Sequence, residues 1–159
     1  MRADVIARRV LEGVSLLLLL AMFLAPVLLW SRLGQQVPVH FDASGQPDRW
    51  GEPWELLLIP AAALLVWLMI ELILHRAKPG HWNLPFVLPY GPTAHVVEPL
   101  KTMVAALGLE SILFFAAIEF MAIASRMEGM GLVMGLLIAL LTLTMVWGLV
   151  RSWRGRWIH

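Results

Sequence analysis

The sequence contains no cysteine, so disulfide bonds, zinc–thiolate sites and thiol chemistry are all excluded. Charge is also scarce, because Asp, Glu, Lys and Arg make up 14% of the 159 residues, whereas a soluble domain usually carries about 25%. The formal net charge of +1 creates no strong field that would attract nucleic acid or an acidic partner. We therefore expect no nucleic-acid partner, and the sequence implies no cofactor.

Apolar residues, by contrast, make up 60% of the sequence, and they come in blocks. A helix needs roughly 20 such residues to cross the hydrocarbon core of a bilayer. Because the backbone must satisfy its own hydrogen bonds in lipid, such blocks form helices. The sequence therefore predicts an all-α integral membrane protein with a bundle of four transmembrane helices. The blocks without Lys, Arg or His are residues 13–31, 56–74, 102–125 and 129–150.

We expect a single membrane domain over residues 1–159. The first block is too long for the core of a signal peptide and lacks a small-x-small cleavage site, so we expect it to be retained. The loop over residues 76–99 is rich in proline, which argues against a continuous helix there. The predicted helices cover about 10–31, 55–75, 100–125 and 130–151, and the remaining long loop covers 32–54.

Basic residues are distributed unevenly over the two sides of the predicted bundle, which indicates its orientation. Nine Lys or Arg residues flank one side and three flank the other. Since cytoplasmic segments carry the excess of Lys and Arg, we expect both termini and the 76–99 loop in the cytoplasm, and the 32–54 loop outside. The nine are Arg2, Arg8, Arg9, Arg76, Lys78, Lys101, Arg151, Arg154 and Arg156, and the three are Arg32, Arg49 and Arg126.

The most distinctive segment is Val37–Gly51, which reads VPVHFDASGQPDRWG in the outer loop. Val39 and Phe41 suggest an extended segment, and Asp42 to Gly45 has the residues of a turn. We therefore expect this loop to be compact. We take the following as candidate ligand-binding residues: Pro38, His40, Phe41, Asp42, Gly45, Pro47, Asp48, Trp50 and Gly51.

This segment resembles the domain of unknown function at the N-terminus of SdpI-type bacterial membrane proteins, in their short four-helix form. The likeness lies in Pro38, His40-Phe41, the run Gly45-Gln46-Pro47-Asp48, and Trp50-Gly51. The later His81-Trp82-Asn83 is similar to that short form as well. The resemblance implies a location in the bacterial cytoplasmic (inner) membrane. It also implies a role as an immunity protein against a secreted killing peptide, or as a sensor.

The outer motif has other interpretations besides recognition of a peptide or lipid. His40, Asp42 and Asp48, with Glu52, offer metal ligands, but their spacing matches no standard signature. An EF-hand is excluded because the glycine stands at the fourth place and Pro53 at the twelfth. A purely structural loop is the third interpretation. In it, Asp48 pairs with Arg49 or Arg32, and His40 bonds to the backbone.

Ionisable side chains inside the predicted spans indicate functional sites by default. Glu110 and Glu119 are nine residues apart, so they point to opposite sides of one helix and form no carboxylate dyad. Glu119 lies in the outer half, within reach of Arg126, Arg32 or Arg49. The depths of the others predict a polar layer in the cytoplasmic half: Ser15, Glu71, His75, Glu110, Thr142 and Thr144. Two interpretations remain open: hydrogen bonds that lock the bundle, or a path for protons or ions.

Small residues recur every four positions at Gly131, Gly135 and Ala139, the pattern by which membrane helices approach closely. We expect this stripe to pack inside the bundle rather than to form a dimer interface. An enzyme is disfavoured, because the sequence has no HExxH or GxSxG motif. Glu71-x-x-x-His75 supplies two metal ligands at most, which are too few for a closed site.

The leading hypothesis is a non-enzymatic receptor or immunity-like protein. Its outer loop would engage a peptide or lipid, and its cytoplasmic loop would report this to a regulator. The alternatives are a small ion-coupled transporter that uses Glu71 and Glu110, and a membrane metalloenzyme with its metal at His40, Asp42 and Asp48.

Overall fold

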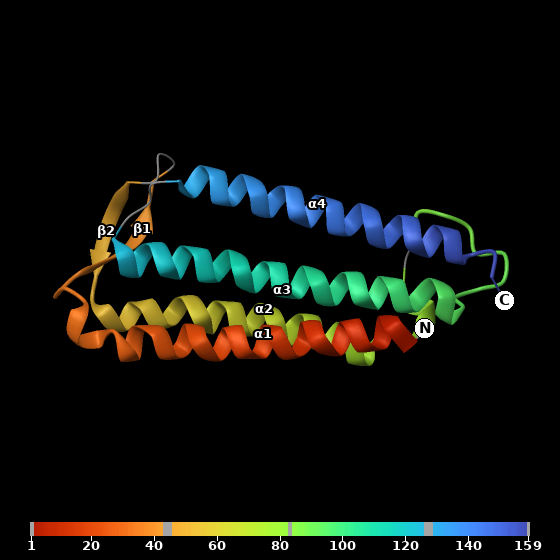
Figure 1. The fold of residues 1–159 in the computed structure, drawn as a ribbon, viewed down its shortest axis with the longest axis horizontal. Helices are drawn as coiled ribbons and strands as arrows, with labels where there is room; N and C mark the ends of the chain where they lie inside the picture. Colours follow the sequence, from red (N-terminus) through yellow and green to blue (C-terminus); the bar gives the residue numbers. More distant parts are fainter. Residues whose placement is uncertain (1, 43–45, 83, 126–128, 159) are drawn as a thin grey trace.

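The computed structural model describes residues 2–42, 46–82, 84–125 and 129–158. Long helices run lengthwise beside one another, a small sheet lies at one end, and both termini lie at the other end (Figure 1). The long helices are α1 (Arg2–Leu28), α2 (Leu58–Arg76), α3 (Ala94–Ala124) and α4 (Met130–Gly155), the strands are β1 (Val37–Phe41) and β2 (Pro47–Gly51), and the short 3-10 helices are η1 (Trp30–Arg32), η2 (Pro53–Leu57) and η3 (Pro79–His81).

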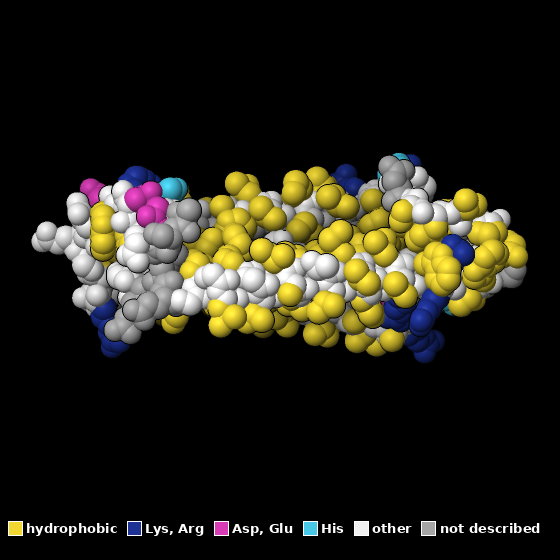
Figure 2. Space-filling model, turned by 90° about the horizontal axis from the view of Figure 1, so that it is seen from above, with side chains coloured by type: hydrophobic (Ala, Val, Ile, Leu, Met, Phe, Trp, Pro, Cys, Tyr) yellow, Lys and Arg dark blue, Asp and Glu magenta, His cyan; other side chains and the backbone are white. Residues whose placement is uncertain are grey.

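In the described part of the chain, 4 helical segments are long and apolar enough to cross a membrane. Their large apolar side chains point outward in many places, for example Leu132, Leu136 and Leu143 on α4. Figure 2 shows apolar side chains along the length of the bundle and charged side chains toward its two ends. A soluble protein does not expose so large an apolar surface. This confirms the prediction of a multi-pass helical membrane protein that lies in a bilayer, and the two-stranded sheet is an addition to the all-α class.

Two of the helices begin earlier than the sequence suggested. α1 begins at Arg2 rather than near residue 10, and α3 begins at Ala94 rather than near residue 100. Pro99 therefore lies inside α3 and not in its first turn. Because proline has no N–H, the carbonyl of His95, four residues earlier, receives no helical hydrogen bond from this position.

α3 is the central helix of the bundle, because it packs against α1, α2 and α4, whereas α4 packs chiefly against α3. The main core cluster combines Leu19 and Met22 from α1 with Ala63 from α2 and Ile112 from α3. All four of these side chains are buried. Since apolar side chains gain no hydrophobic free energy by leaving lipid, close packing is what holds these helices together.

The contact between α3 and α4 is a seam of small residues near the end that holds the termini. A Cβ atom placed on Gly148 would lie 2.6 Å from the Cβ of Met103, and one placed on Gly155 would run into the backbone carbonyl of His95. Between them, the hydroxyl of Ser152 donates a hydrogen bond of 3.0 Å to the carbonyl of Val96. These residues let the two backbones approach closely.

The stripe that the sequence singled out on α4 is not this seam. Gly131, Gly135 and Ala139 are exposed. No described atom lies within 4 Å of a Cβ built on Gly131 or Gly135. The expectation that this stripe packs inside the bundle is therefore wrong. Gly148 of the seam is nine residues from Ala139, so the small residues that meet α3 lie on the opposite face of α4 and nearer its C-terminal end.

We expect Gly148→Ala to destabilise the protein by about 1–3 kcal/mol, the usual cost of forcing extra atoms into a packed interface. The methionine side chain can rotate away, but its Cβ is held by the backbone of α3, so the helices must separate. Thermal unfolding of the purified chain in detergent, followed by tryptophan fluorescence, measures the change. Gly135→Ala is the matched control and should leave the melting temperature unchanged or raise it, because alanine favours helix. Equal melting temperatures for the two variants would contradict the seam.

Candidate functional site

The outer motif forms an antiparallel hairpin of β1 and β2, in which Val37 lies opposite Gly51 and Pro38 opposite Trp50. The register shifts twice along β1, so the pairing is irregular. Val37 is buried against Leu56 of η2 and Ala122 of α3. The hairpin is therefore anchored to the end of the bundle and is not a free loop.

Asp42 closes the tip of the hairpin. Its backbone N–H donates to the carbonyl of Gln46, and its carboxylate accepts from the backbone N–H of Gln46, both at 2.9 Å. This is the turn role that aspartate commonly plays. Gly45, the candidate residue within this turn, lies outside the described residues, as does Asn83 in the later loop.

His40 and Asp48 form a pair across the hairpin, with 2.6 Å between the imidazole Nδ1 and the carboxylate Oδ1. Their side chains are 65% and 45% exposed. The structural interpretation had Asp48 pairing with arginine and His40 bonding to backbone, and this is not the arrangement found. Arg49 instead pairs with Glu55 of η2 at 3.3 Å. Among the described residues, no third metal ligand joins His40 and Asp48.

The motif needs a glycine at Gly51 because a larger residue there would collide with the side chain of Glu55. Glu55 turns back so that its carboxylate accepts a hydrogen bond of 3.0 Å from the backbone N–H of Glu52. A Cβ atom on Gly51 would lie 2.6 Å from the carboxyl carbon of Glu55. Trp54 donates its indole N–H to Glu52 at 2.9 Å. The glycine therefore makes room for the cap that starts η2 and leads into α2.

A cavity of about 230 Å³ lies between the hairpin and the helices. Its wall is mainly apolar and includes Val39, Ile59 and Phe115, and the ion pair of Arg49 and Glu55 also lines it. A polar pair beside an apolar recess is the composition typical of a site that orients a small apolar group.

The polar residues predicted inside the membrane do not form one continuous layer. The hydroxyl of Thr144 donates a hydrogen bond to Glu110 across α3 and α4, while Thr142 bonds to the carbonyl of its own helix at Ile138. Ser15 is buried. Glu71 pairs with His75, 3.3 Å away on the same helix.

Glu119 is 2% exposed, and its Oε1 atom has no hydrogen-bond partner among the described residues. Arg49, one of its expected partners, is engaged with Glu55. Arg126, another of them, lies outside the described residues. The structure therefore places a buried carboxyl group near the hairpin end of α3, three residues from Ala122, against which Val37 of the hairpin packs.

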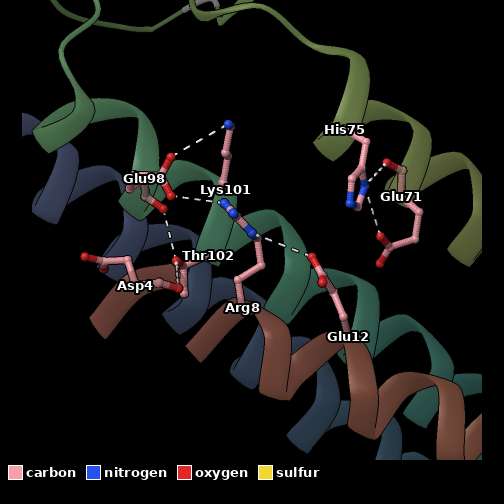
Figure 3. A network of polar contacts seen from close by, with 8 residues as sticks. All are labelled: Asp4, Arg8, Glu12, Glu71, His75, Glu98, Lys101 and Thr102. Atoms are coloured by element: carbon pink, nitrogen blue, oxygen red, sulfur yellow. Dashed lines mark hydrogen bonds and ion pairs between the residues drawn. The ribbon is translucent and has the colours of Figure 1, made fainter. Parts of the chain in front are cut away.

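At the end of the bundle that holds the termini, charged residues link α1 to its neighbours (Figure 3). Arg8 lies 3.1 Å from Glu98 of α3 and 3.6 Å from Glu12 one turn along α1. Lys101 lies 3.7 Å from Glu98. Arg151 of α4 pairs with Asp4 of α1 at 2.9 Å. The hydrogen bond from Thr102 to the carbonyl of Asp4, at 3.3 Å, adds to these links.

Sequence reasoning missed this network because it treated the first nine residues as a polar flank outside the helix. A usable signal was present: Asp4, Arg8 and Glu12 recur every four residues, so they lie on one face of a helix. Glu98 and Thr102 have the same spacing on α3.

Comparison with known proteins gives a family model but no activity. Residues 17–64 match the model described as "Domain of unknown function (DUF1648)", which covers the C-terminal part of α1, the whole hairpin and the start of α2. An uncharacterized protein of Archaeoglobus fulgidus is 35% identical over 83 residues, which are 48% of this chain and 45% of that protein. No solved structure matches the chain. The domain match thus includes the hairpin and the helix segments on either side of it, and α3 and α4 lie beyond it.

We expect the hydrogen bond between Thr144 and Glu110 to lock α3 to α4. A double-mutant cycle with Glu110→Ala and Thr144→Val should give a coupling free energy of about 0.6 kcal/mol, and at most about 1.7 kcal/mol, the range of such bonds between membrane helices. Equilibrium unfolding in detergent measures it. Thr142→Val is the control, because its hydroxyl bonds within α4, and it should not couple to Glu110→Ala. A coupling free energy of zero in both cycles would show that the hydrogen bond between Thr144 and Glu110 does not stabilise the bundle.

Proposed function

We propose that this chain is a non-enzymatic receptor or immunity-like protein of the bacterial cytoplasmic membrane. Its hairpin, outside the cell, would engage a peptide. The observation that carries the proposal is the anchored but exposed motif hairpin above an apolar cavity. Loops held by a rigid scaffold are the usual carriers of binding function.

The motif divides into residues that shape the hairpin and residues that have no such task. Val37 anchors it, Asp42 closes its tip and Gly51 makes room for Glu55. Trp50, by contrast, is an exposed large aromatic side chain. Exposed aromatic residues are enriched among those that dominate binding energy.

The pair of His40 and Asp48 is likewise exposed and contributes little to folding, because an ion pair in water is worth only about 0–1 kcal/mol. Two polar groups held in one geometry beside an aromatic side chain are suited to recognise a peptide backbone or a charged group. The cavity under the hairpin would accept an apolar side chain of the same ligand.

The resemblance to SdpI-type proteins supports an immunity role for this site. The matched domain model covers residues 17–64 and so includes the whole hairpin. In this proposal a killing peptide binds at the hairpin, and the 76–99 loop on the cytoplasmic side reports binding to a regulator.

The orientation that this function needs has both termini inside the cell. It is supported by the basic residues of the sequence, nine of which belong to the segments expected on the cytoplasmic side, against three in the segments expected outside. Exposed tryptophans occur toward both ends, with Trp30 and Trp54 near the hairpin and Trp153 and Trp157 near the C-terminus. Tryptophans at both interfaces are typical of helices that span a bilayer.

A second candidate function, ion-coupled transport, rests on a different observation. One carboxylate oxygen of Glu110 and one of Glu119 are buried without a hydrogen-bond partner among the described residues. Buried carboxylic groups of this kind form proton relays in transporters. Against a transport function, Glu110 already accepts a hydrogen bond from the hydroxyl of Thr144. This is the contact expected if its role is to lock α3 to α4.

The orientation can be tested by labelling, because the natural chain has no cysteine and so gives no background. We expect the variant Gln35→Cys to react with a membrane-impermeant maleimide on intact cells. Lys78→Cys should react only after the membrane is opened. The reverse pattern would contradict the proposed orientation, and with it a binding site outside the cell.

The binding role predicts that cells expressing the chain tolerate a membrane-active killing peptide better than control cells. Trp50→Ala should cost about 2 kcal/mol or more in binding, roughly 30-fold in affinity, and should remove most of the protection. The minimum inhibitory concentration, measured over a panel of such peptides, reports the effect. Gln35→Ala, exposed but outside the motif, is the control and should protect fully. Protection that is absent with the intact chain, or equal with Trp50→Ala, would overturn the immunity proposal.

A further inference from the structure

A cluster of possible metal ligands lies between α1 and α2, far along the bundle from the hairpin. Glu12 of α1 comes together with Glu71 and His75 of α2, and one ligand atom from each lies within 4.8 Å of the other two. We propose that this cluster binds a divalent transition-metal ion, with Zn²⁺ as the representative ion. The proposal is independent of the proposed function, because it shares no residue with the hairpin.

The cluster has the donor set of a three-residue zinc site. Glu71 and His75 are one turn apart on the same face of α2, a spacing at which two side chains on a helix can grip one ion. The helix pair alone supplies two ligands, and Glu12 from the neighbouring helix is the third. Three protein ligands of nitrogen and oxygen, with a fourth position for water, are the usual composition of an open zinc site.

The distances allow the site to close by rotation of side chains alone. Zinc bonds of 2.0–2.2 Å to nitrogen and oxygen place tetrahedral ligand atoms about 3.4 Å apart. The imidazole Nδ1 of His75 is 3.3 Å from Oε2 of Glu71 and 2.9 Å from the backbone carbonyl of Glu71, so the ring must turn away from that carbonyl to bind an ion. The ligand atoms lie within 4.8 Å of one another, so the farthest pair needs to approach by at most about 1.4 Å, which is within reach of glutamate rotamers.

Charge also favours a cation at this place. Two carboxylates lie near each other, and among the described residues Glu71 has no Lys or Arg within ion-pair distance, only His75. Among the described residues, Arg8 is the one arginine that forms an ion pair with Glu12, at 3.6 Å from its Oε1 atom. Arg8 lies nearer to Glu98, at 3.1 Å, so its positive charge is divided between the two carboxylates. The Oε1 atom of Glu12 is buried and has no hydrogen-bond partner among the described residues.

The position gives an ion a way in from water. His75 is 66% exposed and lies next to the end of α2, whereas the Glu12 and Glu71 side chains are 21% and 16% exposed. Figure 3 shows Glu71 and His75 on one helix and Glu12 on the neighbouring one, at the edge of the charged network. An ion would therefore arrive at the imidazole first and then reach the two less exposed carboxylates.

The mixed donor set indicates a transition metal rather than magnesium. Imidazole suits zinc and its neighbours, whereas Mg²⁺ prefers oxygen ligands in an octahedron and keeps several waters. The absence of cysteine excludes competing thiolate sites in the same chain.

The test is a titration of the full chain, purified in detergent without a polyhistidine tag, with ZnCl₂. Calorimetry and elemental analysis should show one Zn²⁺ per chain, and Zn²⁺ should raise the melting temperature, as any ligand of the folded state does. Glu12→Gln, Glu71→Gln and His75→Gln should each weaken binding by roughly tenfold or more, since even groups that support a ligand are worth that much.

His40→Gln is the matched control, because it makes the same change at the other end of the molecule, and it should bind Zn²⁺ like the natural chain. Loss of binding in His40→Gln alone would assign the metal to the hairpin and overturn the proposal. So would the absence of saturable binding, or equal affinity for Mg²⁺. For a variant that has a lower melting temperature even without metal, the readout is the rise in melting temperature on adding Zn²⁺. A rise equal to that of the natural chain would show that the substituted residue is not a ligand of the ion.

Discussion

Lipid offers no hydrogen bonds to a protein backbone, and the rest of this structure depends on that constraint. It requires each crossing segment to be a helix, and it confines the sheet to the end of the bundle, where strand edges can meet water. It also removes the hydrophobic drive for helices to associate. The helices are therefore held by close contact at small residues, as between Gly148 and Met103, and by polar links such as that of Arg8 with Glu98.

The existence of the helices could be predicted from sequence, because long apolar blocks have few other solutions in lipid. Their ends could not. α1 continues back to Arg2 because polar residues of its first turns find partners on α3 and α4, such as Arg151 for Asp4. Such partners depend on the placement of helices ninety or more residues away in sequence, which local pattern does not contain.

The candidate site shows the same division. Alternating apolar residues indicated the extended segment, and the chemistry of Asp42 indicated the turn. The pairing of His40 with Asp48 was missed, because it depends on two register shifts in the hairpin. The sequence did not indicate that Glu12 lies beside Glu71, because this contact depends on how α1 is rotated about its axis relative to α2. In the same way, the spacing of four at Gly131, Gly135 and Ala139 did not indicate which face of α4 would meet α3.

α3 has 31 residues, so it is about 46 Å long, and it is one continuous helix from the charged network to the floor of the hairpin. Ala122 near one end packs under Val37, and Glu98 near the other end holds Arg8. The two contacts therefore belong to one helix. A ligand that pressed on Val37 would act on the same helix that carries the partner of Arg8, which gives the hairpin a direct helical connection to the ion pairs at the far end of the bundle.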